Sequence, residues 1–243
     1  FQENQQLYII LEYCDGGTLL SKIKEKGMIS HRELRHYCQQ ILSAMAYIHS
    51  QNIAHRDIKP ENIFITGDNI VKIADFGLSS HVEHGQMLHT FVGSIPYCPP
   101  EVLDQENYNP FQADIWSLGI TFYKMAVGKL PFNSASKESL RKSIDLMIYP
   151  IPQNLDHDFV DLLGKMIVFD PRKRYSIDSL LRHPYFTKNL QNSIPRRSNN
   201  DGLLYRKNSP LFLPRIVSLS GRTINRNPRR HSGKVSMCTF REV

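Results

Sequence analysis

The sequence predicts an α+β fold, in which a mainly helical body carries one strand near its start and a small β ribbon, and a basic tail follows. Three observations predict it: an early apolar run, two short apolar runs around a central turn, and helical periodicity elsewhere. The 243 residues, 41% of them hydrophobic, can bury the core of one ordinary domain.

Composition also bounds the setting in which the chain works. No apolar run approaches the roughly 20 residues that a membrane-spanning helix needs, and the opening FQENQQLYIILEY lacks the features of a signal peptide. The four cysteines show neither metal-ligand spacing nor the density of a disulfide scaffold. We therefore expect no transmembrane segment and a cytoplasmic or nuclear location.

The first predicted strand is Leu7 to Tyr13, which Asp15-Gly16-Gly17 ends before a short helix from Thr18 to Lys26. The first residue is Phe, not Met, and the strand begins so early that no earlier strand of the same sheet is expected. We therefore expect a chain truncated at its N-terminus.

A long amphipathic helix is predicted from Ser30 to Ser50, because apolar residues recur there every three to four positions. Ser30 with Glu33 indicates a capping box at its start. Two apolar runs then follow, Asn62 to Thr66 and Val71 to Ala74. Gly67-Asp68-Asn69 separates them, which favours an antiparallel ribbon.

Helical periodicity returns from Pro100 to Phe186, with breaks at prolines 131, 150, 152 and 171. Charge then divides the chain. From residue 188 onward there are 12 Lys and Arg against two acids, whereas residues 1–187 hold 18 bases and 21 acids. The polar, basic composition from Asn192 predicts disorder. We expect a domain at 1–186 and a basic, largely disordered tail at 187–243.

Four motifs follow one another around the ribbon and the helices after it. They are HRDIKPEN at 55–62, DFG at 75–77, GSIPYCPPE at 93–101 and DIWSLG at 114–119. Each of their polar residues alone would more often be a turn, a cap or a solvated charge. The ordered set resembles the eukaryotic protein kinases of the serine/threonine type. The sequence from Gly93 to Glu101, with HPYF at 183–186, is most similar to the calmodulin-dependent and AMP-activated kinase group.

The resemblance implies the use of ATP and Mg²⁺. Asp57 would accept or orient the proton of the substrate hydroxyl, and Lys59 would lie against the γ-phosphate. Asn62 and Asp75 would hold magnesium, a hard cation that prefers oxygen ligands.

The resemblance also implies structural roles. His55 and Phe76 would belong to an apolar stack that marks an assembled active state, and Asp114 would anchor the catalytic loop from below. Glu101 and Arg174 would form a buried ion pair, whose disruption costs roughly 3–5 kcal/mol.

For the nucleotide, Leu7 to Cys14 resembles the strand and hinge that meet adenine. Leu11 would limit the depth of the pocket, Glu12 and Cys14 would offer backbone groups, and Phe64 would lie under the base. A plain core role is open for Leu11 and Phe64. Thr18 stands where many relatives have a Glu that contacts ribose and a substrate arginine, which weakens an arginine-directed specificity.

Regulation and substrate class follow from the segment between Asp75 and Glu101. Thr90 occupies the position of a phosphorylated threonine in relatives, so an upstream kinase is an expected partner, and Arg56 would meet the phosphate. Lys59 and Ser94 resemble the serine/threonine type. Protein substrates with Ser or Thr are therefore expected.

Two alternatives stay open. Nothing in the sequence corresponds to the glycine-rich loop, strand lysine and helix glutamate of relatives, so the chain could be a catalytically inactive kinase-like scaffold or binding module. The basic tail, with Arg196-Arg197 and Arg229-Arg230, could contact nucleic acid or acidic membranes by charge, although a solvated linker is the commoner role of such a run.

Overall fold

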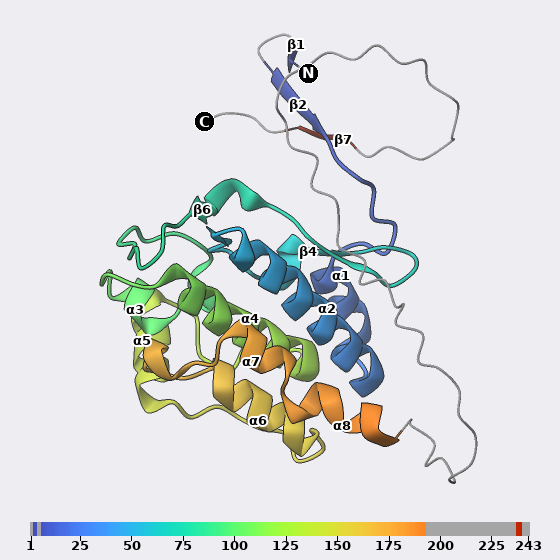
Figure 1. Cartoon of the computed structure of the whole chain (residues 1–243), viewed down its shortest axis with the longest axis vertical. Helices are drawn as coiled ribbons and strands as arrows, with labels where there is room; N and C mark the ends of the chain where they lie inside the picture. Colours follow the sequence, from blue (N-terminus) through green and yellow to red (C-terminus); the bar gives the residue numbers. More distant parts are fainter. Residues whose placement is uncertain (1, 4–5, 193–236, 240–243) are drawn as a thin grey trace, which may run out of the picture. The chain divides into compact units, whose positions relative to one another are not determined.

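The computed structural model describes residues 2–3, 6–192 and 237–239, and the chain divides into two compact units (Figure 1). One unit holds an antiparallel sheet in which β2 is the middle strand. Its strands are β1 (Gln2–Glu3), β2 (Gln6–Ile10) and β7 (Met237–Thr239). The other unit, Cys14–Ser193, carries the remaining described elements.

The first strand differs from its prediction at both ends. It stops at Ile10 instead of Tyr13, and a loop follows that contains Asp15 and Gly17. There Asp15 accepts a hydrogen bond from the Gly67 amide, and the Gly17 carbonyl accepts one from Ile65 at 2.8 Å. The expectation that no strand precedes it in the sheet was wrong, since β1 pairs with it.

Two described elements lie within the predicted tail, whose bounds stay a prediction. Helix α8 (Pro184–Asn192) continues past residue 187, where the tail was predicted to begin. Met237–Thr239 forms a strand paired with β2, in a stretch predicted to be disordered. The other tail predictions, including the arginine pairs at 196–197 and 229–230, lie outside the described residues.

The second unit is built around α4, a helix whose side chains are buried almost all round. Helices α2 and α6 pack against it, as Figure 1 shows. Among the described residues, no helix is long and apolar enough to cross a membrane. The helices are α1 (Leu19–Lys26), α2 (His31–Ser50), α3 (Pro100–Leu103), α4 (Pro110–Val127), α5 (Lys137–Leu146), α6 (His157–Met166), α7 (Ile177–Leu181) and α8.

The predicted ribbon is present. Strands β4 (Ile63–Ile65) and β5 (Val71–Ile73) pair antiparallel, with Phe64 opposite Lys72. A second small pair joins β3 (Ile53–Ala54) to β6 (Ser80–His81). Short 3₁₀ turns connect these strands and helices. They are η1 (Pro60–Asn62), η2 (Phe76–Leu78), η3 (Ile95–Tyr97) and η4 (Pro171–Lys173). The motif HRDIKPEN thus lies just before β4, and DFG lies just after β5.

Helix α2 begins with Ser30 as predicted, but the capping box is incomplete. The Ser30 hydroxyl accepts from the Glu33 amide at 3.4 Å and donates to the Glu33 carboxylate at 2.6 Å. The Glu33 carboxylate also forms ion pairs with Lys26 and Lys22, at N–O distances of 3.0 and 3.4 Å. Full capping boxes instead open α1, at Thr18 and Ser21, and α5, at Ser136 and Ser139.

This arrangement makes the contribution of Glu33 to stability depend on pH. The hydrogen bond from Ser30, opposed by partial burial and assisted by Lys26, lowers the pKa of Glu33 to about 2. Its pKa in the unfolded chain is near 4.3, so the carboxylate stabilises the fold above about pH 4, and this is lost as pH falls toward 2. Because the Glu33 side chain is still 29% exposed and solvent screens its charge, the effect should stay below about 1 kcal/mol.

We therefore expect Glu33→Gln to lower the free energy of unfolding at pH 7 and to match the parent chain more closely at pH 3. Urea denaturation at both pH values measures it. Glu25→Gln, on exposed surface, is the control. An equal loss at both pH values would contradict the assignment.

Candidate active site

Asp57 lies at the centre of a hydrogen-bonded cluster between the β ribbon and the segment before α3. Its carboxylate is almost fully buried and accepts from Lys59 Nζ at 2.6 Å and from the Ser94 amide at 2.9 Å. The Asn62 amide donates to the Asp57 carboxylate at 3.2 Å and to its backbone carbonyl at 2.9 Å. Burial raises the pKa of Asp57, but the bonds from Lys59 and Ser94 outweigh it, so the pKa lies below its usual value. The carboxylate is therefore ionised at neutral pH.

Lys59 joins the two sides of this cluster. Besides Asp57, its ammonium donates to Ser94 Oγ at 2.7 Å. The position of Ser94 depends on the preceding glycine, Gly93, for two reasons. Gly93 has a φ of +97°, and an added Cβ would lie only 2.5 Å from the Arg56 carbonyl oxygen. Only glycine allows this close approach. In the sequence, Ser94 indicated the substrate class. Nothing there indicated that its backbone amide bonds the Asp57 carboxylate.

Asp114 holds the loop that carries Asp57, as the resemblance implied. It is fully buried in α4. Its carboxylate accepts from the amides of His55 and Arg56 at 2.9 and 2.8 Å, and it lies 2.9 Å from His49 Nε2. Since Arg56 has the left-handed φ of 65°, these bonds stabilise a conformation that non-glycine residues seldom adopt. His49 is a supporting residue that sequence reasoning missed.

Asp75 and Phe76 follow β5 and begin η2. Asp75 is exposed, has a φ of 64° and accepts a long bond from the Gly77 amide at 3.4 Å. The rings of His55 and Phe76 lie 4.9 Å apart, and His55 Nε2 lies 3.0 Å from the Ala74 carbonyl oxygen. Phe76 is 42% exposed, and its contact with His55 is the ring contact that the described residues supply to the expected apolar stack.

The chemistry of these side chains fits magnesium. Asn62 directs its amide nitrogen toward Asp57, which leaves its carbonyl oxygen as a ligand, and the bond that Asp75 accepts from the Gly77 amide is long. Both offer hard oxygen donors. Within the described residues no group of three or more His, Cys, Asp or Glu could hold a metal ion by itself.

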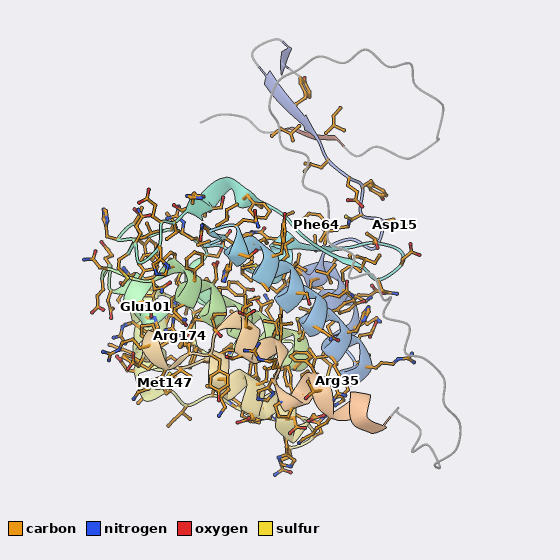
Figure 2. The ribbon with its side chains drawn as sticks, viewed as in Figure 1. Asp15, Arg35, Phe64, Glu101, Met147 and Arg174 are labelled. Atoms are coloured by element: carbon orange, nitrogen blue, oxygen red, sulfur yellow. The ribbon has the colours of Figure 1, made fainter. Side chains whose placement is uncertain are left out.

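The residues expected near a nucleotide fall into both units. Leu11, 60% exposed, and Glu12 lie in the unit of β2, whereas Cys14, Thr18 and Phe64 lie in the helical unit. Phe64 and Asp15 are labelled in Figure 2. The Thr18 hydroxyl accepts from the Ser21 amide at 3.1 Å, so Thr18 caps α1. Its role at a ribose and the adenine roles of the others remain predictions.

Thr90 and Arg56 are linked through Tyr108, which sequence reasoning missed. Thr90 is exposed, and its carbonyl oxygen accepts from the Tyr108 hydroxyl at 3.0 Å. Burial raises the pKa of Tyr108, and a hydrogen bond with Arg56 opposes the increase. Arg56 Nε itself donates to the Leu78 carbonyl at 2.6 Å. A guanidinium therefore lies beside the tyrosine that holds the Thr90 backbone.

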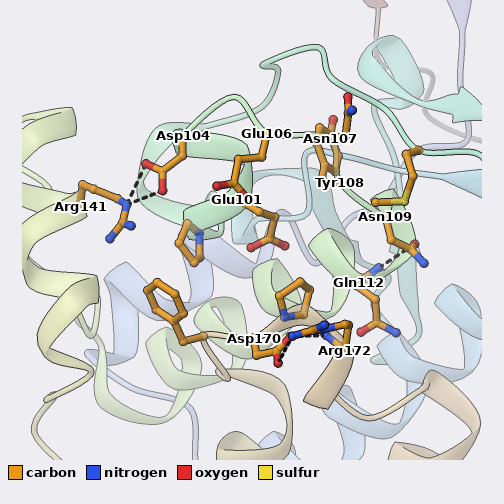
Figure 3. A pocket seen from close by; sticks show the side chains of 14 residues that line it. Glu101, Asp104, Glu106, Asn107, Tyr108, Asn109, Gln112, Arg141, Asp170 and Arg172 are labelled. Carbon is orange, nitrogen blue, oxygen red and sulfur yellow. Dashed lines mark hydrogen bonds and ion pairs between the residues drawn. The ribbon is translucent and has the colours of Figure 1, made fainter.

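Glu101 and Arg174 form a two-pronged ion pair, with N–O distances of 2.6 and 2.8 Å, and both side chains are buried (Figure 2). Arg174 also donates to the carbonyls of Val168 and Gln112, each at 2.9 Å. Beside this pair is a cavity of about 690 Å³, in which Asp104 meets Arg141 and Asp170 meets Arg172 (Figure 3). The cavity is lined by none of Asp57, Lys59, Asn62 and Asp75.

Comparison with known proteins supports the resemblance to protein kinases. The family described as protein kinase domain matches residues 1–186. A probable serine/threonine-protein kinase of Dictyostelium discoideum is 40% identical over 190 residues, which cover 78% of this chain and 23% of that protein. Sperm motility kinase 1 of Mus musculus is 39% identical over 187 residues, or 77% of this chain and 39% of that protein.

A third relative comes from plants. The SNF1-related protein kinase catalytic subunit alpha KIN12 of Arabidopsis thaliana is 39% identical over 184 residues, which cover 76% of this chain and 37% of that protein. The chain therefore spans less than half the length of each of these three relatives. Together with the family match over residues 1–186, this similarity shows that the chain belongs to the eukaryotic protein kinase superfamily.

Proposed function

We propose that this chain transfers the γ-phosphoryl group of ATP to serine and threonine hydroxyls of protein substrates. The observation that carries the proposal is the cluster around Asp57. A buried, ionised carboxylate, a lysine ammonium and an amide side chain meet there within hydrogen-bond distance. Phosphoryl transfer depends mainly on positioning and charge neutralisation, which is what such a cluster supplies.

In the proposed reaction, Asp57 orients the substrate hydroxyl and accepts its proton as the hydroxyl oxygen attacks the γ-phosphorus. The bond between that phosphorus and the β,γ-bridging oxygen breaks, and ADP leaves. Lys59 lies against the γ-phosphoryl oxygens and compensates their charge. Asn62 and Asp75 hold magnesium, which neutralises phosphate charge when bound.

The fixed donors keep this geometry in place before substrate binds. Asp114 fixes the backbone on the N-terminal side of Asp57, and Ser94 holds one carboxylate oxygen, so the other is shared by Lys59 and Asn62. Substrate hydroxyl binding would replace part of that shared contact. Preorganisation of this kind lowers the barrier without reorganisation during the reaction.

The partners follow from the same proposal: proteins with accessible Ser or Thr, and an upstream kinase for Thr90. ATP and magnesium are available in the cytosol and nucleus, where we place the protein. Cys38 and Cys98 are buried free thiols.

The test is incubation of the purified chain with labelled ATP, Mg²⁺ and a peptide mixture that contains Ser, Thr or Tyr. We expect label on Ser and Thr peptides and its loss when EDTA removes the magnesium. Binding of ATP or peptides without transfer would overturn the proposal in favour of the inactive binding module. Label on Tyr alone would overturn the substrate class.

A further prediction concerns Thr90. Phosphate there would lie near Arg56, so we expect Thr90→Ala to lower the transfer rate of phosphorylated protein by about tenfold or more, the value of one charge-assisted hydrogen bond. Mass spectrometry should establish Thr90 phosphate in the parent, and steady-state transfer rates measure the effect. Thr187→Ala, in α8, is the control. Equal rates for Thr90→Ala and its parent would exclude this regulation.

A further inference from the structure

Lys137 opens α5 and lies against the segment that leads to Ser94. Its ammonium is 4.9 Å from the centroid of the Phe91 ring. The start of α5 is fixed, because Ser136 Oγ accepts from the Ser139 amide at 3.1 Å and Ser139 Oγ accepts from the Ser136 amide at 2.8 Å. The position of Lys137 is therefore set by a capped helix and an aromatic ring.

The segment from Phe91 to Tyr97, called the wall below, connects the ring that Lys137 contacts with Ser94 in the catalytic cluster. Phe91 packs against the core, and Ser94 bonds Asp57. Tyr97 is held at its carbonyl by Ser117 and at its hydroxyl by Lys124, each at 2.9 Å. Within the wall Ile95 is 37% exposed. Because Ser94 bonds the Asp57 carboxylate, a substrate whose hydroxyl reaches Asp57 would lie next to this wall.

The charge of Lys137 is uncompensated by any ion pair. Within the described ranges, Lys59 pairs with Asp57 and Lys124 bonds Tyr97, but Lys137 contacts only the ring of Phe91. Burial raises the pKa of the Cys98 thiol to about 12, and the nearby charge of Lys137 opposes the increase. The positive charge of Lys137 thus acts on Cys98, the residue that follows the segment from Phe91 to Tyr97. The next acid, Glu138, bonds its own backbone amide and Ser136 at the start of the helix, and the charges of Lys137 and Lys142 also help to lower its pKa without forming an ion pair.

We propose that Lys137 is a specificity-determining residue that favours substrates carrying an aspartate or glutamate near the phosphoacceptor serine or threonine. The inference rests on the proposed function and names its substrate class. The ammonium of Lys137 lies over the Phe91 ring, and since this contact gives it no carboxylate partner, it can meet a carboxylate of a substrate at the edge of the wall. Such a contact is partly solvated, so it discriminates substrates modestly, by about two- to fivefold.

The experiment uses fluorescent serine peptides in which one Glu is moved position by position along an otherwise neutral sequence. Fluorescence anisotropy gives the Kd of each peptide and of its Gln counterpart, for the parent chain, Lys137→Glu and Lys142→Glu. Lys142 lies on the same helix, is exposed and undergoes the same charge change. Thermal denaturation checks that all three chains are folded.

We expect the parent and Lys142→Glu to bind one Glu peptide about two- to fivefold more tightly than its Gln counterpart. Lys137→Glu should lose or reverse that preference. No preference in the parent, the same preference in Lys137→Glu, or no measurable peptide binding would each overturn the inference. Failure of phosphoryl transfer with this discrimination intact would overturn the proposed function alone, because the binding measurement requires no transfer.

Discussion

Replacing Asp57 by asparagine should reduce the rate of phosphoryl transfer to serine peptides by about 10²- to 10⁴-fold. Asparagine keeps the size and shape of the side chain, but its single carbonyl oxygen can accept either from the Ser94 amide or from Lys59, which bond different oxygens of Asp57. It cannot accept a proton, and it removes the negative charge that orients the substrate hydroxyl. Initial rates with labelled ATP, at saturating peptide, measure the loss.

Two controls separate chemistry from folding and nucleotide binding. Asp68→Asn makes the same change in the exposed turn between β4 and β5 and should leave the rate unaltered. Binding of a fluorescent ATP analogue to Asp57→Asn should stay within about threefold of the parent, less than 1 kcal/mol. Transfer by Asp57→Asn at half the parent rate or more would remove Asp57 from the proposed chemistry.

The catalytic cluster shows which contacts a sequence can predict. The positions of Asp57 and Asn62, five residues apart around a short turn, follow from the motif and the ribbon after it. The bond between Asp57 and the Ser94 amide joins residues 37 apart, and it depends on the positive φ of Gly93 and its closeness to Arg56. Periodicity and turn chemistry carry no information on such an approach, which tertiary packing determines.

The same limit applies to Tyr108 and His49. Each lies far along the chain from the group that it supports, Thr90 in one case and Asp114 in the other. Nothing in the spacing of either aromatic ring distinguishes it from a core side chain. Helix boundaries were better predicted, because α1 and α2 begin at Thr18 and Ser30, whose hydroxyls satisfy free amides. The first strand was predicted to run on to Tyr13, whereas it ends at Ile10.

Removing the charge of Arg174 should destabilise the helical unit more than any surface change. We expect Arg174→Met to lower the free energy of unfolding by about 3–5 kcal/mol, because it leaves the Glu101 carboxylate buried without its partner. It also frees the Val168 and Gln112 carbonyls, which Arg174 now bonds. Urea denaturation followed by circular dichroism measures the loss. Arg172→Met, two residues earlier and 88% exposed, should change little.

A double variant tests whether the unpaired carboxylate is the cause. Adding Glu101→Leu to Arg174→Met removes the remaining buried charge, and replacing both members of a buried pair by apolar groups is often far less costly than removing one. The double variant should therefore be more stable than Arg174→Met alone. If it is less stable by the full additive loss, the cost arises from the lost packing against Trp116, whose ring lies 5.1 Å from the Arg174 guanidinium, and from the freed carbonyls.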